Sequence, residues 1–114
     1  MAGCIFCKIA SGEVSAKIVH QNDHVVVFRD LNPQAPVHVL VIPKKHIENL
    51  SSSEETDLSM MREIFSAILK VTKDEKLSAD GFRVVANDGK NGGQTVNHLH
   101  FHVLGGRPMS WPPG

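Results

Sequence analysis

The chain has 114 residues, with 12 lysines and arginines balanced by 12 aspartates and glutamates, and 41% of its residues are hydrophobic. This length suits a single domain spanning 1–114, and the apolar content together with zero net charge excludes an intrinsically disordered chain. A neutral chain has no overall field that attracts nucleic acid, and no apolar run approaches the roughly 20 residues that span a bilayer, so neither is an expected partner.

Short apolar runs bounded by turn residues predict one helix and three strands in the first part of the chain. The expected helix covers 4–10, and the expected strands cover 18–20, 25–29 and 37–42. The polar residues 21–24 separate the first two strands, which predicts a hairpin.

A longer helix is predicted further on, after Ser52 and Glu55, whose spacing fits a capping box. It is expected to run to about Lys76, because apolar residues recur at helical spacing. This stripe, expected to pack in the core, consists of Leu58, Met61, Phe65, Ile68 and Leu69.

Two further strands are predicted at 82–87 and 95–104, joined by a glycine-rich connection at 88–93. Successive strands with short connections favour an antiparallel sheet over a parallel one. The fold class expected is therefore α+β: a five-stranded antiparallel sheet with one long helix on a face and a short N-terminal helix.

Three histidines alternate with apolar residues in the last of these strands. Strand side chains two residues apart project from one face, about 6.5–7 Å apart, so His98, His100 and His102 are expected to share one side. The residues expected to face the core between and after them are Leu99, Phe101 and Val103. Because neighbouring imidazoles repel each other's positive charge, at most one is expected to be protonated near neutral pH. A neutral ring beside one that carries a proton suits nucleophilic attack coupled to acid catalysis.

The histidine row fits an ordinary solvated strand face or a metal site less well. The exposed face of an antiparallel strand usually carries mixed polar residues, so three histidines in strict alternation are unusual there. A single metal ion cannot bind all three, because the outer two lie about 13 Å apart and a zinc–nitrogen bond is only about 2 Å long.

The only two cysteines, Cys4 and Cys7, form a C-x-x-C pair. In a reducing compartment this spacing suggests a metal half-site or a redox pair rather than a structural disulfide. Because no strand precedes the pair, redox catalysis of the thioredoxin type is disfavoured. No basic segment followed by an apolar stretch begins the chain, so we expect no signal peptide and a cytoplasmic location.

The row His98-Leu99-His100-Phe101-His102-Val103-Leu104 matches the His-φ-His-φ-His-φ-φ motif, φ being apolar, of the histidine triad (HIT) superfamily. The surrounding sequence resembles its Hint branch, the nucleotide-binding phosphoramidases. The matching stretches are 5–9, 28–38, 40–47, 92–95, 105–107 and 111–114.

This resemblance implies a homodimer whose two sheets join into one ten-stranded sheet, and hydrolysis of adenosine and other purine phosphoramidates such as adenylated lysine. Catalysis would pass through a nucleotidyl-histidine. By motif position, His100 is the nucleophile on the α-phosphorus, and His102 binds the phosphate and helps protonate the leaving amine. His98 and His38 would orient the row. The nitrogen of His100 that does not attack should be held by an acceptor that fixes the tautomer.

The connection before the row has a physical reason to bind phosphate. Glycine at Gly93 lets backbone N–H groups approach an anion, and Thr95, where the family commonly has serine, adds a hydroxyl. Gln94 lies between them, and Asn87 at the end of a strand could donate to the same phosphate. Without the row, a plain hairpin loop and a strand cap would account for these residues equally well.

Asp30 could accept both ribose hydroxyls, although a turn residue has the same appearance. The resemblance implies an apolar slot for the purine, formed by residues that would otherwise be assigned to the core: Phe6, Ile9, Phe28 and Leu31. It also implies that the tail carrying Trp111 reaches toward the partner's active site.

Some members of the superfamily bind structural zinc through a C-x-x-C pair and two histidines. In this chain the matching residues are Cys4, Cys7, His46 and His98, a set that suits tetrahedral zinc; the alternative is that the cysteines are small buried residues. His98 bound to zinc could still donate from its other nitrogen to His38.

Two alternatives to the phosphoramidase remain: a dinucleoside polyphosphate hydrolase, and a nucleotide-sensing or scaffold dimer that binds without catalysis. The Trp-Pro-Pro-Gly ending and the short chain favour the phosphoramidase over the first. Intact histidines at His100 and His102 favour an enzyme over the second.

Overall fold

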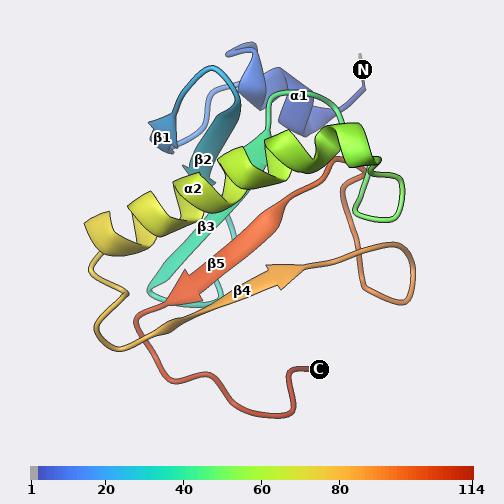
Figure 1. Ribbon diagram of the computed structural model, residues 1–114. Coiled ribbons are helices and arrows are strands. Elements are labelled where there is room, and N and C mark those ends of the chain that lie inside the picture. Colours follow the sequence, from blue (N-terminus) through green and yellow to red (C-terminus); the bar gives the residue numbers. More distant parts are fainter. Residues whose placement is uncertain (1–2) are drawn as a thin grey trace.

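The computed structural model describes residues 3–114 and contains one five-stranded antiparallel sheet with the order β1-β2-β3-β5-β4 (Figure 1). Its elements are α1 (Ile5–Ala10), β1 (Ile18–Gln21), β2 (Val25–Arg29), β3 (Val37–Pro43), the 3-10 turn η1 (Glu55–Asp57), α2 (Leu58–Asp74), β4 (Phe82–Ala86) and β5 (Phe101–Gly105). The α+β class, the strand number and the hairpin of β1 and β2 are confirmed. No helix within this part of the chain is both long and apolar enough to cross a membrane.

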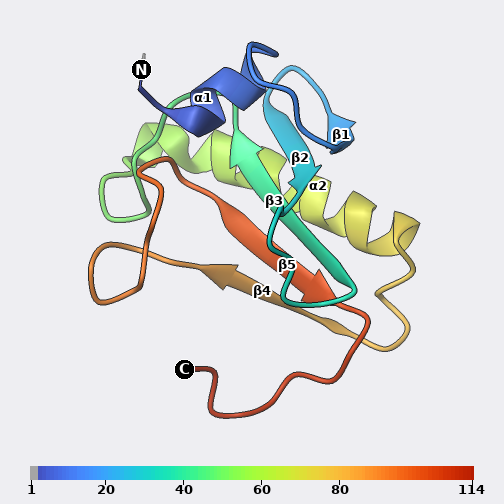
Figure 2. The ribbon, with the colours of Figure 1, turned by 180° about the vertical axis from the view of Figure 1, so that it is seen from behind.

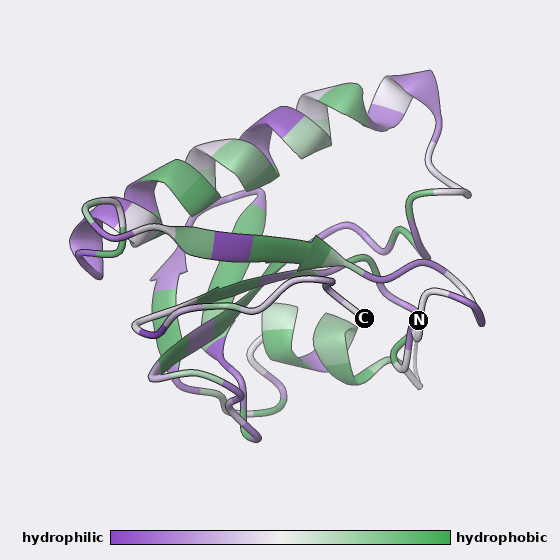
Figure 3. Cartoon of the chain, turned by 90° about the horizontal axis from the view of Figure 1, so that it is seen from below, coloured by the Kyte–Doolittle hydropathy of each residue, from purple (hydrophilic) through white to green (hydrophobic). Residues whose placement is uncertain are grey.

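The two α-helices cover opposite faces of the sheet (Figure 3). Seen from behind, α1 is nearest the viewer and α2 lies beyond the strands (Figure 2). Alternation along β3 separates the two faces: Val39 and Val41 pack in the core on the α2 side, whereas Leu40 and Ile42 pack with Phe6 of α1. His38 precedes Leu40 by two residues and therefore belongs to the α1 face.

The buried side of α2 differs from the predicted one. Ile64, Ala67, Ile68 and Val71 face the core, so Ile68 is the only fully buried member of the predicted stripe. Leu58, Phe65 and Leu69 are 60%, 49% and 61% exposed, and Met61 is half-buried. Several of these apolar residues therefore form a second stripe that the single chain leaves uncovered.

The start of this helical region also differs from the prediction. The capping box joins Glu54 and Asp57, not Ser52 and Glu55, and it caps η1 rather than α2. Ser52 instead forms hydrogen bonds with Asn49 in the preceding turn. Both pairs have an acceptor three residues before a carboxylate, so sequence spacing could not distinguish them.

The last strand begins later than predicted. β5 starts at Phe101, and residues 95–100 are irregular. β4 leaves β5 after Ala86, which pairs with Phe101, and on the other side the proline at Pro43 has no N–H to donate. The segment before Phe101 is held instead by a hydrogen bond from the Leu99 N–H to the Ile47 carbonyl, 2.6 Å long.

Candidate functional site

The alternation of the histidine row continues beyond the strand. Leu99, Phe101 and Val103 are buried in the α2-side core as predicted. His98 and His100 turn to the α1 face, where the Phe6 ring stands edge-on to both, with centroid distances of 6.0 and 5.1 Å. His102, in β5, lies beside His100 with 5.2 Å between ring centroids. The three imidazoles thus share one side of the segment, although only His102 belongs to a strand.

The tautomer of His100 is determined by its neighbour. Its Nδ1 lies 2.7 Å from the backbone carbonyl of His98. A carbonyl can only accept a hydrogen bond, so His100 Nδ1 carries the proton and Nε2 keeps its lone pair. This is the arrangement that a nucleophilic histidine needs, and the acceptor predicted from the chemistry is present.

A second chain of contacts determines the tautomer of His102. The Gln34 N–H donates to His38 Nδ1 at 3.1 Å, so the His38 proton lies on Nε2. His38 Nε2 is 2.9 Å from His102 Nδ1 and 3.4 Å from an Asp30 carboxylate oxygen. Because His38 Nε2 donates to His102 Nδ1, the proton of neutral His102 must lie on its Nε2.

Burial keeps these rings uncharged. Desolvation lowers the pKa of His102 to about 4, and the neighbouring His100 and His38 lower it further, while Asp30 opposes the shift. Desolvation likewise lowers the pKa of His38 and of His98. The tautomers deduced above for neutral rings therefore apply at neutral pH.

A pocket of about 310 Å³ lies on the α1 face of the sheet beside His100 and His102. Its volume falls at the small end of the range for ligand sites in proteins. Eight of the predicted site residues line it: Phe6, Ile9, Phe28, Asp30, Leu31, Thr95, His100 and His102. An apolar slot that ends in a carboxylate and two imidazoles can hold a flat apolar ring at one end and an anion at the other.

Four predicted contact residues do not line this pocket. Asn87 donates to the Gly92 carbonyl, and Gln94 is used within the loop, accepting from the Gly89 N–H and donating to the Glu48 and Val96 carbonyls. Gly93 adopts a φ of +73° in the connection before the row, a value that favours glycine. Trp111 is 81% exposed in the C-terminal tail.

The pocket also contains residues that the sequence did not single out. Val14, Ser15 and Ala16, in the link between α1 and β1, form one wall, and Leu40 and Val96 contribute apolar surface. Small and apolar residues of this kind carry no local chemical signal, so only the fold could assign them to a site.

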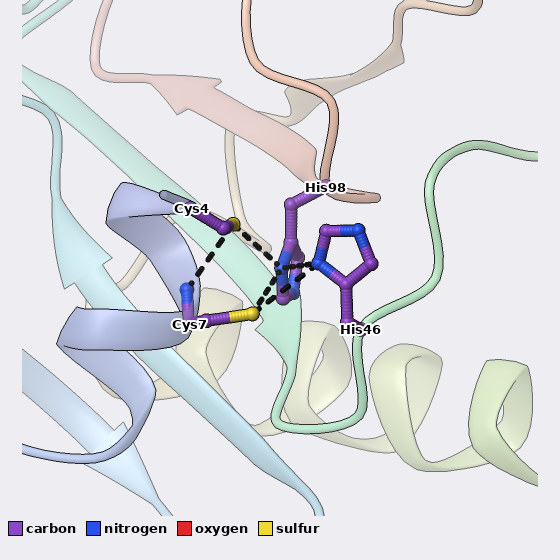
Figure 4. Close-up of side chains that lie close together, drawn as sticks. All are labelled: Cys4, Cys7, His46 and His98. Atoms are coloured by element: carbon purple, nitrogen blue, oxygen red, sulfur yellow. Dashed lines mark hydrogen bonds between the residues drawn. The ribbon is translucent and has the colours of Figure 1, made fainter. Parts of the chain in front are cut away.

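Cys4, Cys7, His46 and His98 converge beside the pocket, and their side chains point toward one another (Figure 4). Their donor atoms all lie within 4.8 Å of one another. Cys7 Sγ is 3.2 Å from His46 Nδ1, Cys4 Sγ is 3.3 Å from His98 Nδ1, and the two Nδ1 atoms are 3.2 Å apart. In tetrahedral zinc sites adjacent donor atoms are about 3.3–3.8 Å apart, so the group fits such an ion.

The orientation of His98 corrects one expectation. Its Nε2 lies 2.8 Å from the Pro43 carbonyl and therefore donates there, not to His38. His38 supports His102 instead. With its proton on Nε2, His98 presents the Nδ1 lone pair to the two cysteines and His46.

Comparisons with known proteins agree with this geometry. The family model described as HIT domain matches residues 11–109. The chain belongs to the HIT domain family. The matched region contains the histidine row and most of the pocket, whereas Cys4, Cys7 and Trp111 lie outside it.

Individual HIT proteins cover nearly the whole chain. A crystal structure described as a HIT family hydrolase from Legionella pneumophila is 46% identical, with a TM-score of 0.96 over 98% of this chain and 100% of that one. An uncharacterized HIT-like protein from Synechocystis is 48% identical over 96% of both chains. A histidine triad nucleotide-binding protein from Candida albicans is 32% identical, with a TM-score of 0.83 over 96% of this chain and 83% of that one.

The lowered pKa of His102 predicts that this HIT domain loses stability in acid. The unfolded chain binds a proton at His102 below its ordinary pKa of 6.5, whereas the folded chain resists doing so until about pH 4. The free energy of unfolding should therefore fall between pH 6.5 and pH 4. We expect His102→Gln to reduce this fall by roughly 1–2 kcal/mol, an amount discounted for partial exposure, as measured by urea unfolding at pH 7.0 and 4.5.

The matched control is His24→Gln, because His24 is exposed and outside the site. This variant should keep the wild-type difference between the two pH values. An equal pH dependence in wild type and His102→Gln would contradict the prediction.

Proposed function

We propose that this chain is a purine nucleoside phosphoramidase of the Hint branch. It would hydrolyse adenosine and other purine 5′-phosphoramidates, adenylated lysine among them, through a nucleotidyl-histidine intermediate. One observation carries the proposal: His100, with a free Nε2 lone pair, and His102, with a protonated Nε2, line the same pocket. A nucleophile and an acid side by side match the two requirements for cleaving a P–N bond.

The reaction would proceed in two steps. The lone pair on His100 Nε2 attacks the α-phosphorus, and the P–N bond to the amine breaks as His102 Nε2–H gives its proton to the leaving nitrogen. Water then attacks phosphorus and loses a proton to His102, which releases the nucleoside monophosphate and restores neutral His100. The His98 carbonyl stabilises the positive charge on the His100 ring while phosphorus is attached.

The rest of the pocket supports a nucleotide substrate. Its apolar walls, with Phe6 and Phe28 in edge-to-face contact at 5.5 Å, suit a purine ring. Asp30 accepts from the Asn32 N–H through one oxygen and keeps lone pairs for ribose hydroxyls. The names of the Candida albicans and Legionella pneumophila relatives, a nucleotide-binding protein and a hydrolase, agree with this assignment.

The nucleophile assignment is tested by brief incubation with an adenosine phosphoramidate, followed by mass analysis without acid. We expect an adenylate adduct on His100 in the wild type. In His100→Ala the adduct should disappear and turnover should fall at least about 10³-fold, because the covalent route is lost. His24→Ala, which changes a histidine outside the site, should retain both.

Each of the remaining outcomes has a distinct meaning. Unchanged turnover in His100→Ala would eliminate the nucleophile assignment. Faster cleavage of a diadenosine polyphosphate than of the phosphoramidate would favour the dinucleoside polyphosphate hydrolase. Tight nucleotide binding without turnover of either compound would indicate a binding or scaffold protein.

We further propose that Cys4, Cys7, His46 and His98 hold a structural zinc ion. The donor spacing and the Nδ1 lone pair of His98 support this, and a solvent-filled cleft of about 960 Å³ lined by Cys4 and His46 offers an entry path. Bound zinc would cross-link α1 to the segments before and after β3 and β5. Paired free thiols also fit a cytoplasmic location, where they stay reduced.

Protein expressed with ample zinc should contain about one zinc per chain by elemental analysis. Cys4→Ser with Cys7→Ser should lower the content to near zero, and the control His24→Ala should leave it unchanged. Chelation should lower the free energy of unfolding by roughly 3 kcal/mol if zinc is supplied at 100 times its dissociation constant. Wild-type protein free of zinc after such expression would reject the site.

We also propose a homodimer formed through the β4 edge. β4 pairs with β5 only, and its Phe82 and Val84 are exposed beside the uncovered stripe of α2 that includes Phe65 and Leu69. Figure 3 views this edge and shows mostly hydrophobic residues along it. Joining two such edges would pair the strands, bury the apolar residues and extend the sheet to ten strands. In this dimer the Trp111 tail would approach the partner's pocket.

Sedimentation at micromolar concentration should give twice the mass of one chain. Leu69→Lys should raise the dissociation constant at least about tenfold, because it places a charge in the apolar contact. The matched control Leu31→Lys changes a leucine that is 94% exposed and far from β4 in the sheet order, so it should stay dimeric. A monomeric wild type would contradict the dimer.

A further inference from the structure

Arg107 makes an unusual contact for an exposed side chain. Its Nε and Nη2 both donate to the carbonyl of Gln34, at 3.0 and 2.9 Å, and its Nη1 donates to the Pro108 carbonyl at 2.9 Å. The contact joins the residues after β5 to the turn between β2 and β3, 73 positions away in the sequence. Charge-assisted hydrogen bonds from two guanidinium nitrogens hold one carbonyl more firmly than a neutral donor could.

The same two segments also pack closely. Gly106 has a φ of +91°, and a Cβ at this position would lie 2.9 Å from the Pro36 side chain. The turn over 31–36 is otherwise exposed and irregular, with Pro33 and Pro36 limiting its hydrogen bonds. Arg107 is therefore a main polar attachment of this turn to the sheet.

Gln34 connects this attachment to the histidines. Its carbonyl is held by Arg107, and its N–H donates to His38 Nδ1 at 3.1 Å. His38 Nε2 in turn meets His102 Nδ1 at 2.9 Å. One continuous series of hydrogen bonds thus runs from an exposed guanidinium to the ring that faces the pocket.

We propose that Arg107 is a positioning residue for His102: by holding Gln34 in place, it keeps the proton of His102 on the nitrogen that faces the pocket. The role of His102 as proton donor rests on the proposed function, but the tautomer itself does not. Arg107 does not line the pocket, so its effect must pass through Gln34 and His38.

The chemical consequence follows from the donor and acceptor roles. If Gln34 moves away, His38 Nδ1 loses its donor and the His38 proton can lie on either nitrogen. The Nδ1–H form of His38 turns an Nε2 lone pair toward His102 Nδ1, which then needs the proton itself. His102 Nε2 is left without one, so it cannot protonate a leaving amine.

The tautomers can be measured directly by long-range ¹H–¹⁵N correlation of the imidazole rings. In the wild type, His38 and His102 should both show the Nε2–H form. Arg107→Ala should convert both to mixtures of the two tautomers, and Arg107→Lys, which keeps the charge and one donor, should lie between. The matched control is Arg83→Ala: Arg83 also donates to a backbone carbonyl, that of Ser110 at 2.8 Å, but does not contact Gln34.

Kinetics give a second readout that a general loss of structure would not reproduce. In Arg107→Ala we expect kcat for an adenosine phosphoramidate to fall about tenfold, because misplacing a general acid costs part of its contribution, with KM nearly unchanged. Cleavage of the p-nitrophenyl ester of AMP should fall less than about twofold, since this leaving group needs no proton. Adding Arg107→Ala to His102→Gln should cause no further loss.

The outcomes separate the two proposals. Wild-type protein inactive on phosphoramidates would defeat the proposed function, while the tautomers would still decide the role of Arg107. Unchanged tautomers in a folded Arg107→Ala would overturn the positioning role. Equal loss of activity on both substrates, or an additive loss with His102→Gln, would overturn it as well.

Discussion

The site depends on the direction of each imidazole's outward hydrogen bond. A neutral imidazole has one donor and one acceptor, so the partner on one side decides what the other side can do. The His98 carbonyl, 2.7 Å from His100 Nδ1, leaves a lone pair on Nε2, and the series from Gln34 through His38 leaves a proton on His102 Nε2. Identical side chains thereby acquire opposite chemical roles.

His98 takes part in two sites at once, because its backbone and its side chain act separately. Its carbonyl holds His100, while its ring lies among Cys4, Cys7 and His46. The ring is fully buried and anchored to the Pro43 carbonyl, so the backbone that accepts from His100 has little freedom. An ion among these side chains would stiffen the same residue further, and its contribution to the nucleophile would be positional rather than chemical.

The elements that follow from local pattern were predicted well, and those that depend on distant partners were not. The bounds of β2 match the prediction because a β-branched run carries its own signal. The buried side of α2 was misassigned because two apolar stripes compete on that helix, and the single chain covers only one of them. The late start of β5 depends on Ala86 and Pro43, which neighbour it only in the folded sheet.

The candidate site shows the same division. Histidine spacing predicted a shared face correctly even where the strand is absent, because the alternation of side chains survives in an extended segment without a ladder. The tautomers depend on carbonyl and N–H groups of Pro43, His98 and Gln34, and backbone groups of this kind give a sequence no distinguishing pattern. Arg107 acts on one of those groups from 73 residues away. A residue whose only partner is main chain leaves no pattern of complementary side chains, so its role can be assigned only when the fold brings it to the turn that supports His38.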